Sequence, residues 1–148
     1  MNALETLSDA LEALVEKVSP SVVGVEHERG QGSGMLLTQD GYVITNAHVV
    51  ERARGATMVR LGPLWSERAA LVGLDKKTDV AVLKVDASAR PALPFADSSK
   101  LRVGRVVVAI GNPLRFDRSV SLGVISAIDR SLPSPGGLFE GLIQTDAA

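Results

Sequence analysis

The chain is 148 residues long, with 45% hydrophobic and 22% charged residues, which is the composition of a folded domain rather than a disordered segment. Its 16 basic and 17 acidic residues give a formal charge of -1, so no sequence-wide field favours nucleic acid or an anionic membrane. The chain has no cysteine and only 2 histidines, which excludes disulfides and thiolate catalysis and argues against a metal site. We therefore expect no cofactor, no metal ion and no nucleic acid partner.

The first 18 residues predict one amphipathic helix. Apolar residues recur there at three- and four-residue steps with acidic residues between them, and Ser19 and Pro20 end the pattern. The apolar face favours a helix that packs on the body of its own chain, and the alternative is a helix that contacts a neighbouring subunit. The acidic residues do not fit a signal peptide, which has a basic start followed by an apolar stretch.

After Pro20 the pattern changes to short segments that are rich in β-branched residues and separated by turn residues. Such segments predict antiparallel strands, and six in succession are typical of a small closed barrel or a sandwich. The six segments are residues 21–28, 33–38, 41–46, 57–61, 67–74 and 80–85. Three more candidate strands follow, at residues 105–113, 119–128 and 141–147. The stretch at 132–137, which contains proline and glycine, predicts a loop between the last two.

Residues 86–100 contain prolines and small residues without apolar periodicity, which predicts a connection with a boundary near Phe95. The expected domains are an N-terminal amphipathic helix at 1–18, a first β-barrel at 19–95 and a partial second β-barrel at 96–148. Three strands cannot close a barrel, so the second unit is expected to present an unpaired strand edge. Such an edge can pair with a second copy of the chain.

Two polar residues lie at strand ends, where side chains can reach a cleft. His48 follows the predicted strand at 41–46, and Asp79 precedes the predicted strand at 80–85. Taken singly, a histidine in such a place is usually a packed or surface residue, and an aspartate is usually a turn residue. The alternative is an aspartate that fixes the tautomer of a histidine acting as a base.

The other candidates for chemistry fit structural roles better. Ser33 lacks the flanking glycines of a Gly-Xaa-Ser-Xaa-Gly nucleophile elbow, so we expect it to be a strand residue. The glycines around it do not complete a dinucleotide-binding fingerprint. His27 occupies an alternating strand position, where we expect it to face solvent or to fill a polar corner. The arginines interspersed with acidic residues are expected on a solvated barrel surface, namely Arg52, Arg54, Arg60 and Arg68.

Five segments carry a more specific pattern, and they follow one another in a fixed order. They are GSGMLLTQDGYVITNAHVV (32–50), LVGLDKKTDVAVLKV (71–85), SSKLRVGRVVVAIGNP (98–113), SVSLGVISAIDRS (119–131) and IQTDAA (143–148). Together they closely resemble the HtrA/DegP family of trypsin-like serine proteases. The resemblance implies an all-β, chymotrypsin-like double β-barrel with the first barrel complete, the second barrel incomplete, and an N-terminal α-helix. It also implies that His48 is the general base and Asp79 the residue that orients it, while 32–34 and 110–113 are structural.

The family continues beyond the IQTDAA segment with a Gly-Asn-Ser-Gly-Gly-Pro motif that bears the nucleophile. The chain stops at Ala148, so we expect it to lack the catalytic serine and the oxyanion donors and to be inactive alone. The resemblance implies a parent serine endopeptidase that degrades unfolded or misfolded proteins, commonly as a trimer with a downstream PDZ module. The residues leave the compartment open, and the resemblance implies a periplasmic, extracytoplasmic or membrane-tethered protein with its leader removed.

A non-catalytic alternative also fits the sequence. A pseudoprotease or interaction module could bind unfolded polypeptide through exposed strand edges, with no chemistry at His48 and Asp79. A reading frame that runs past Ala148 into the Gly-Asn-Ser-Gly-Gly motif would favour the protease, and a stop codon at that point would favour the alternative.

Overall fold

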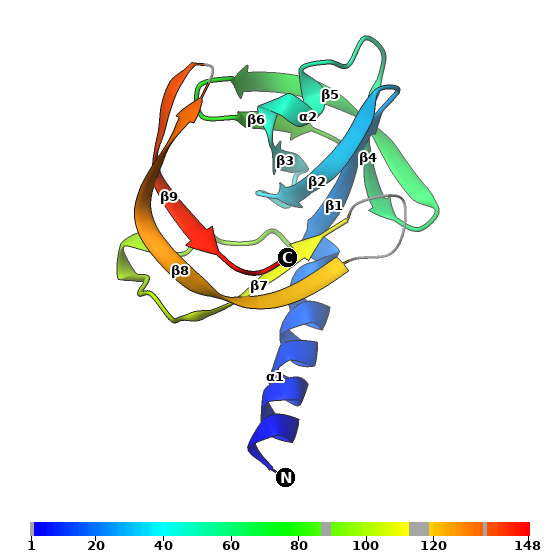
Figure 1. Ribbon diagram of the computed structural model, residues 1–148. Helices are drawn as coiled ribbons and strands as arrows, with labels where there is room; N and C mark the ends of the chain where they lie inside the picture. Colours follow the sequence, from blue (N-terminus) through cyan, green and yellow to red (C-terminus); the bar gives the residue numbers. More distant parts are fainter. Residues whose placement is uncertain (1, 87–89, 113–118, 135) are drawn as a thin grey trace.

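The computed structural model describes residues 2–86, 90–112, 119–134 and 136–148. These residues form a mostly β architecture that is preceded in the chain by one long N-terminal helix, as the sequence predicts (Figure 1). Six strands form a closed barrel, and three further strands form a separate sheet beside it. The predicted combination of one complete barrel and one incomplete β unit is therefore confirmed.

The barrel has the strand order β1-β2-β3-β6-β5-β4, and β1 pairs with β4 to close it. All of these pairings are antiparallel. The strands are β1 (Val22–His27), β2 (Gly30–Leu36), β3 (Tyr42–Thr45), β4 (Thr57–Gly62), β5 (Trp65–Asp75) and β6 (Val80–Lys84). The strand pattern allows a barrel or a sandwich, and the structure shows a closed barrel.

Alternate side chains of the barrel strands fill the interior, because successive side chains point to opposite faces of a strand. In β6, Ala81 and Leu83 are fully buried while their neighbours are half-buried. Burial of a large apolar side chain stabilises the fold by about 1.5–3 kcal/mol. The core consists of Val23, Val25, Leu36, Val43, Val49, Val50, Val59, Leu61, Ala81, Leu83 and Val85. Two of these valines come from the short helix after β3, so this helix packs directly on the barrel core.

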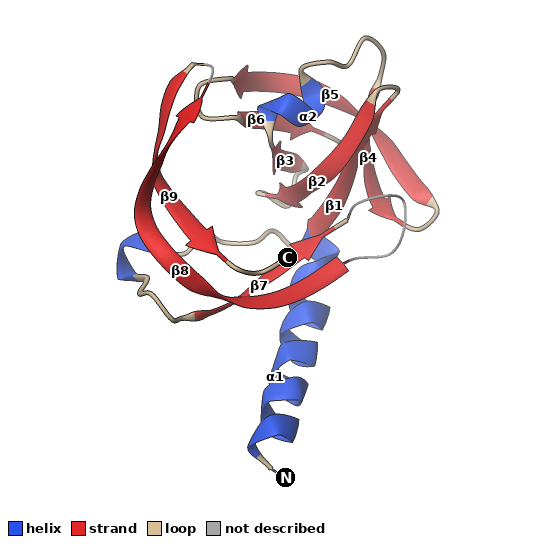
Figure 2. Cartoon of the chain, viewed as in Figure 1, coloured by secondary structure: helices blue, strands red, loops and turns tan. Residues whose placement is uncertain are grey.

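The second unit is an antiparallel sheet of order β7-β8-β9. A 3-10 turn, η2 (Ser98–Lys100), precedes β7 (Val106–Gly111), which pairs with the first part of β8 (Ser119–Ser134). The rest of β8 pairs with β9 (Gly137–Thr145), and shifts in their register mark bulges that bend the pair (Figure 2). The large apolar side chains that this sheet leaves exposed are Val106, Val120, Leu122, Val124, Ile128, Leu132, Leu138 and Ile143.

The predicted loop at 132–137 is wrong for most of its length. Ser134 pairs with Gly137, so β8 and β9 stay paired up to the turn between them. An antiparallel hairpin needs only two connecting residues, and the pairing therefore continues past Pro133. Residue 135 lies outside the described residues.

Helix α1 (Ala3–Val18) begins at a capping box. The side chain of Asn2 accepts a hydrogen bond from the Glu5 main-chain N–H at 3.0 Å, and the Glu5 carboxylate accepts one from the Asn2 N–H at 2.8 Å. No residue of the helix is buried, and the helix projects away from the barrel (Figure 1). The expectation that its apolar face packs on the body of the chain is therefore wrong for most of the helix, since Leu4 is 73% exposed. Only Leu11, Val15 and Val18 are half-buried.

A 3-10 turn, η1 (Ser19–Ser21), connects α1 to β1. Within the described residues, every helix is too short or too polar to cross a membrane. The hydroxyl group of Ser21 donates a hydrogen bond to the Pro91 main-chain oxygen at 2.6 Å. This bond holds the segment that follows β6 against the residue that precedes β1.

Replacing Gly34 by alanine is expected to destabilise the barrel. A Cβ atom at Gly34 would lie 2.9 Å from Val43 Cγ1 and 3.0 Å from the Ile44 main-chain oxygen, so the neighbouring strand would have to move. We expect Gly34→Ala to lower the free energy of unfolding by about 1–3 kcal/mol in urea titrations followed by circular dichroism. Gly73→Ala is the matched control, because no atom lies within 4 Å of its Cβ position. Equal losses in the two variants would contradict the prediction.

Candidate active site

His48 lies on α2 (Ala47–Val50), a single helical turn that follows β3. The other three residues of the turn, Ala47, Val49 and Val50, are buried. His48 faces outward, with 65% of its side chain exposed. Because its three neighbours are apolar and buried, the sequence of this turn directs the imidazole away from the core.

Asp79 precedes β6 and has a left-handed backbone conformation with a φ of 57°. This region is uncommon for residues other than glycine, although aspartate adopts it more readily than most. The main-chain oxygen of Asp79 accepts hydrogen bonds from the Ala47 main-chain N–H and the Asn46 side-chain amide, each at 3.1 Å. These bonds tie the residue to the start of α2 and bring its carboxylate to His48.

The Asp79 carboxylate accepts two hydrogen bonds from His48. Its Oδ1 accepts from the main-chain N–H of His48 at 2.9 Å, and its Oδ2 lies 2.7 Å from the imidazole Nδ1. An ionised carboxylate can only accept, so Nδ1 carries the hydrogen of this bond. In the neutral ring, Nε2 is then the free acceptor. The structure thus brings together the two residues that the sequence singles out, and the aspartate sets the tautomer of the histidine.

The carboxyl group of Asp79 is ionised at neutral pH. Partial burial acts to raise its pKa, but the hydrogen bonds from the His48 main chain and imidazole outweigh burial, together with the electrostatic attraction of His48. The net effect holds the pKa of Asp79 below its ordinary value. Because 26% of the Asp79 side chain is exposed, water still reaches part of the carboxylate.

A cleft of about 590 Å³ opens beside the pair, between the barrel and the β8–β9 hairpin. Its lining residues are Ala47, His48, Glu51, Lys76, Lys77, Asp79, Gly136 and Phe139. The Lys76 ammonium forms an ion pair with the Glu51 carboxylate at 3.2 Å. No group of three or more His, Asp or Glu side chains in the described part of the chain is placed to hold a metal ion. The cleft gives a second molecule access to the exposed imidazole.

Ser33 lies in β2, and its hydroxyl oxygen accepts a hydrogen bond from the Asn112 main-chain N–H at 2.8 Å. This bond ties the barrel to the segment after β7, which agrees with the structural role expected of Ser33 and of the stretch 110–113. Pro113 lies outside the described residues. Among the residues that the structure describes, no serine or threonine hydroxyl hydrogen bonds to the imidazole of His48. The structure therefore pairs an imidazole with a carboxylate and places no described hydroxyl group against them.

The structure distinguishes between the two positions expected for His27 and corrects the position expected for Arg60. The side chain of His27 is 2% exposed, so it fills a polar corner and does not face solvent. The expected solvated position of Arg60 is wrong, because its guanidinium forms an ion pair with Glu26 at 2.9 Å and its side chain is 13% exposed. Alternation along a strand tells which residues share a face, but it does not tell which face lies under another segment.

Comparisons with known proteins bear on this site and on the fold around it. The trypsin-like peptidase domain family matches residues 32–148. A "Probable periplasmic serine endoprotease DegP-like" of Halomonas elongata is 50% identical over 123 residues, and one of Pseudomonas putida is 48% identical over 117 residues. These alignments cover 83% and 79% of this chain but 25% and 24% of the relatives. The chain thus spans about a quarter of the length of the curated relatives it matches.

A solved structure is similar over a larger share of its own length. The crystal structure of Deg5 matches with a TM-score of 0.84 and 34% sequence identity, and the match covers 100% of this chain and 76% of that chain. The predicted chymotrypsin-like fold class is confirmed by this likeness.

Asp79→Asn is expected to reverse the tautomer of His48. The Oδ1 position accepts from the main-chain N–H of His48, so the asparagine oxygen must occupy it and the asparagine N–H groups must face Nδ1. Nδ1 then becomes the acceptor, and the ring hydrogen moves to Nε2. Proton–nitrogen correlation spectra of the imidazole distinguish the two tautomers. The same tautomer in both proteins would contradict the hydrogen-bond assignment.

Asp79 is expected to make stability depend on pH in the acid range. Because its pKa in the folded chain lies below its ordinary value of 3.8, the ionised carboxylate stabilises the fold above that value. This contribution is lost as the pH falls through the folded pKa. We expect wild type to have a larger free energy of unfolding than Asp79→Asn at neutral pH, with a gap that narrows below pH 3.8. Denaturant titrations across this range measure the gap, and a constant gap would overturn the prediction.

Proposed function

The chain belongs to the trypsin-like peptidase domain family, as an HtrA/DegP-like protease domain, and from this premise we propose that His48 and Asp79 serve a serine endopeptidase. His48 is the general base and Asp79 is the acid that orients it. The observation that carries the proposal is the 2.7 Å contact between His48 Nδ1 and Asp79 Oδ2, which leaves Nε2 as the acceptor.

In the proposed reaction, His48 Nε2 takes the proton of a serine hydroxyl as the serine oxygen attacks a peptide carbonyl. The ionised Asp79 stabilises the resulting imidazolium, which returns the proton to the leaving amine as the peptide bond breaks and an acyl-enzyme forms. A water molecule then gives a proton to Nε2 and attacks the ester. The carboxylic acid product leaves, and the proton returns to the serine oxygen.

The proposed nucleophile is a serine in a Gly-Asn-Ser-Gly-Gly motif that these 148 residues do not contain. The main-chain N–H groups at that serine and at the glycine two residues before it are the proposed oxyanion donors. We infer that the 148 residues alone are inactive toward peptides. The exposed apolar side chains of the β7-β8-β9 sheet support this inference, because a closed second barrel would bury such a face.

The proposed domains follow the division of the strands into a closed barrel and a separate sheet. The proposed segments are 1–18 for the N-terminal amphipathic helix, 19–95 for the first barrel and 96–148 for a partial second barrel. The closure of the first sheet and the open form of the second support the boundary between the two β units.

Unfolded or misfolded protein is the proposed substrate. An extended polypeptide can enter the open cleft beside His48 and can pair its main chain with a strand edge. We propose that copies of the protein associate, in the trimer that the family resemblance implies, and that the unpaired edges of the 148-residue chain also favour edge-to-edge pairing. The exposed leucines on α1 support association between copies.

His48→Ala is expected to abolish hydrolysis by the whole protein that contains these residues. With an unfolded, fluorescently labelled protein as substrate, we expect His48→Ala to lower kcat/KM by about 10⁶-fold, because it removes the base. We expect Asp79→Asn to lower it by about 10⁴-fold, because the base then has the wrong tautomer. Lys100→Ala is the control, since Lys100 lies on the exposed turn η2 and outside the cleft lining. The control should keep the activity of the wild-type protein.

The same assay separates the proposed outcomes. The 148-residue chain is expected to hydrolyse no more substrate than the His48→Ala whole protein. Full activity in the His48→Ala whole protein would refute the proposed role of this residue. A whole protein that binds unfolded polypeptide without cutting it would instead support the non-catalytic alternative.

A further inference from the structure

The helix that carries His48 is too short to be stable by itself. A single turn is far below the length that an isolated helix needs, so the position of α2 depends on its contacts with other elements. At its start, the Ala47 main-chain N–H donates to the Asp79 main-chain oxygen at 3.1 Å. Near its end, the main-chain oxygen of Val49 lies 2.6 Å from Nε2 of His27, in β1. The residue after His48 is thus held by a second histidine, which the proposed reaction does not use.

The tautomer of His27 follows from its two contacts. Its Nδ1 accepts a hydrogen bond from the Arg29 main-chain N–H at 3.1 Å, so Nδ1 carries no hydrogen. Nε2 must then carry the hydrogen and donate it to the Val49 main-chain oxygen. The Glu28 carboxylate lies 3.9 Å from Nδ1, beyond hydrogen-bond distance. Since the ring is 2% exposed, water cannot easily replace the bond to Val49.

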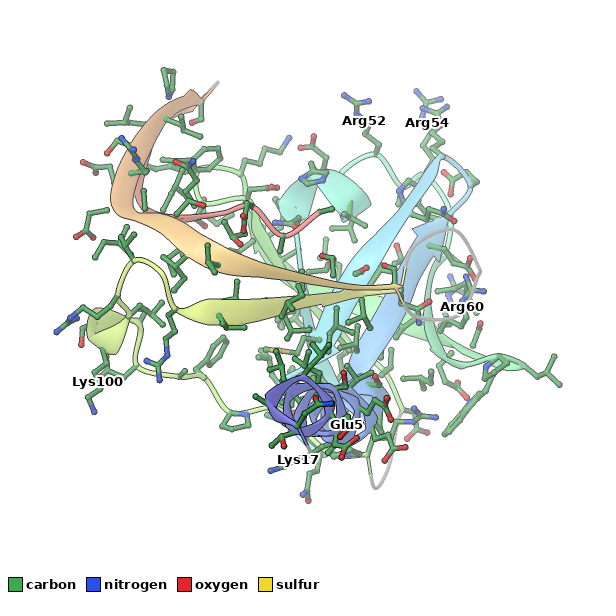
Figure 3. The ribbon with its side chains drawn as sticks, turned by 60° about the horizontal axis from the view of Figure 1, so that its bottom comes forward. Glu5, Lys17, Arg52, Arg54, Arg60 and Lys100 are labelled. Atoms are coloured by element: carbon green, nitrogen blue, oxygen red, sulfur yellow. The ribbon has the colours of Figure 1, made fainter. Side chains whose placement is uncertain are left out.

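Two further contacts join the β1–β2 hairpin to the same segment. A Cβ atom at Gly32 would lie 2.7 Å from Val49 Cγ2, so the glycine lets the valine pack closely on β2. The Glu28 carboxylate accepts a hydrogen bond from the Arg54 main-chain N–H at 2.6 Å, while the Arg54 side chain points outward (Figure 3). The hairpin therefore holds α2 and the loop after it, and His27 is the hairpin side chain that hydrogen bonds to α2 itself.

We propose that His27 is a positioning residue for His48. Its ring N–H holds the Val49 main-chain oxygen, which fixes the orientation of α2 and keeps the His48 imidazole in line with the Asp79 carboxylate. His27 itself touches no reacting atom. The inference rests on the proposed function because that function makes His48 the base. The contact between His27 and Val49 does not depend on this role.

Two amide variants test the contact with matched chemistry. Glutamine places its amide nitrogen near the position of Nε2, whereas asparagine reaches only as far as Nδ1. In His27→Asn the Val49 oxygen loses its donor, and we expect the Nδ1 hydrogen of His48 to exchange with water about tenfold faster. In His27→Gln we expect exchange close to that of wild type. Proton NMR of the 148-residue chain measures the exchange of this hydrogen.

Val23→Ala controls for a general loss of stability, because it removes core volume from the same strand and leaves the hydrogen bond between His27 and Val49 in place. It should leave the exchange of the His48 Nδ1 hydrogen unchanged while the chain is folded. Equal exchange in His27→Asn and wild type, or equal acceleration in all three variants, would overturn the inference. If His27→Asn does not fold, the wild-type spectrum decides, because a His27 ring without a protected hydrogen on Nε2 would also overturn it.

A kinetic measurement separates this inference from the proposed function. In the whole protein, His27→Asn should lower kcat by about tenfold at unchanged KM, and His27→Gln should restore it. If the NMR result is as expected but the wild-type whole protein hydrolyses nothing, the positioning of His48 holds and the proposed reaction fails. If hydrolysis depends on His48 but neither readout responds to His27→Asn, the positioning role alone fails.

Discussion

The two hydrogen bonds that the Asp79 carboxylate accepts from His48 join positions 31 residues apart, and the whole site depends on them. Strand pairing makes this contact possible. Thr45 at the end of β3 pairs with Ala81 near the start of β6, so the residues after one strand and before the other lie at the same end of the barrel. The pairing of two strands in a closed antiparallel barrel thus brings an imidazole and a carboxylate to one place.

The elements that carry the two side chains are weak on their own. Asp79 has an uncommon backbone conformation, and His48 lies on a single turn of helix. Both are held by their surroundings, because Val49 and Val50 belong to the barrel core and Ala47 bonds to the main chain at Asp79. Local strain persists only where the neighbouring structure over-determines it. The stability of the barrel and the geometry of the site are therefore coupled.

Much of the fold could be predicted because its signals are local. Period-two alternation and turn residues indicate the barrel strands, and five motifs in order indicate the family, which singles out His48 and Asp79. The sequence left two positions open for His27, and it did not predict the ion pair of Arg60 or the exposed surface of α1, because each depends on which segment lies opposite in space. The continued β8–β9 pairing was missed because prolines there resemble a loop. The catalytic roles of His48 and Asp79 stay a prediction.

The left-handed backbone at Asp79 has a consequence for replacing this residue by another acid. A glutamate would keep the negative charge, but it adopts this conformation less readily and its extra methylene moves the carboxylate away from the two donors of His48. Aspartate thus suits both the left-handed main chain at position 79 and the short distance from this main chain to the two donors of His48. In a mutant library restricted to acidic residues, selection at this position would favour aspartate before any catalytic requirement is considered.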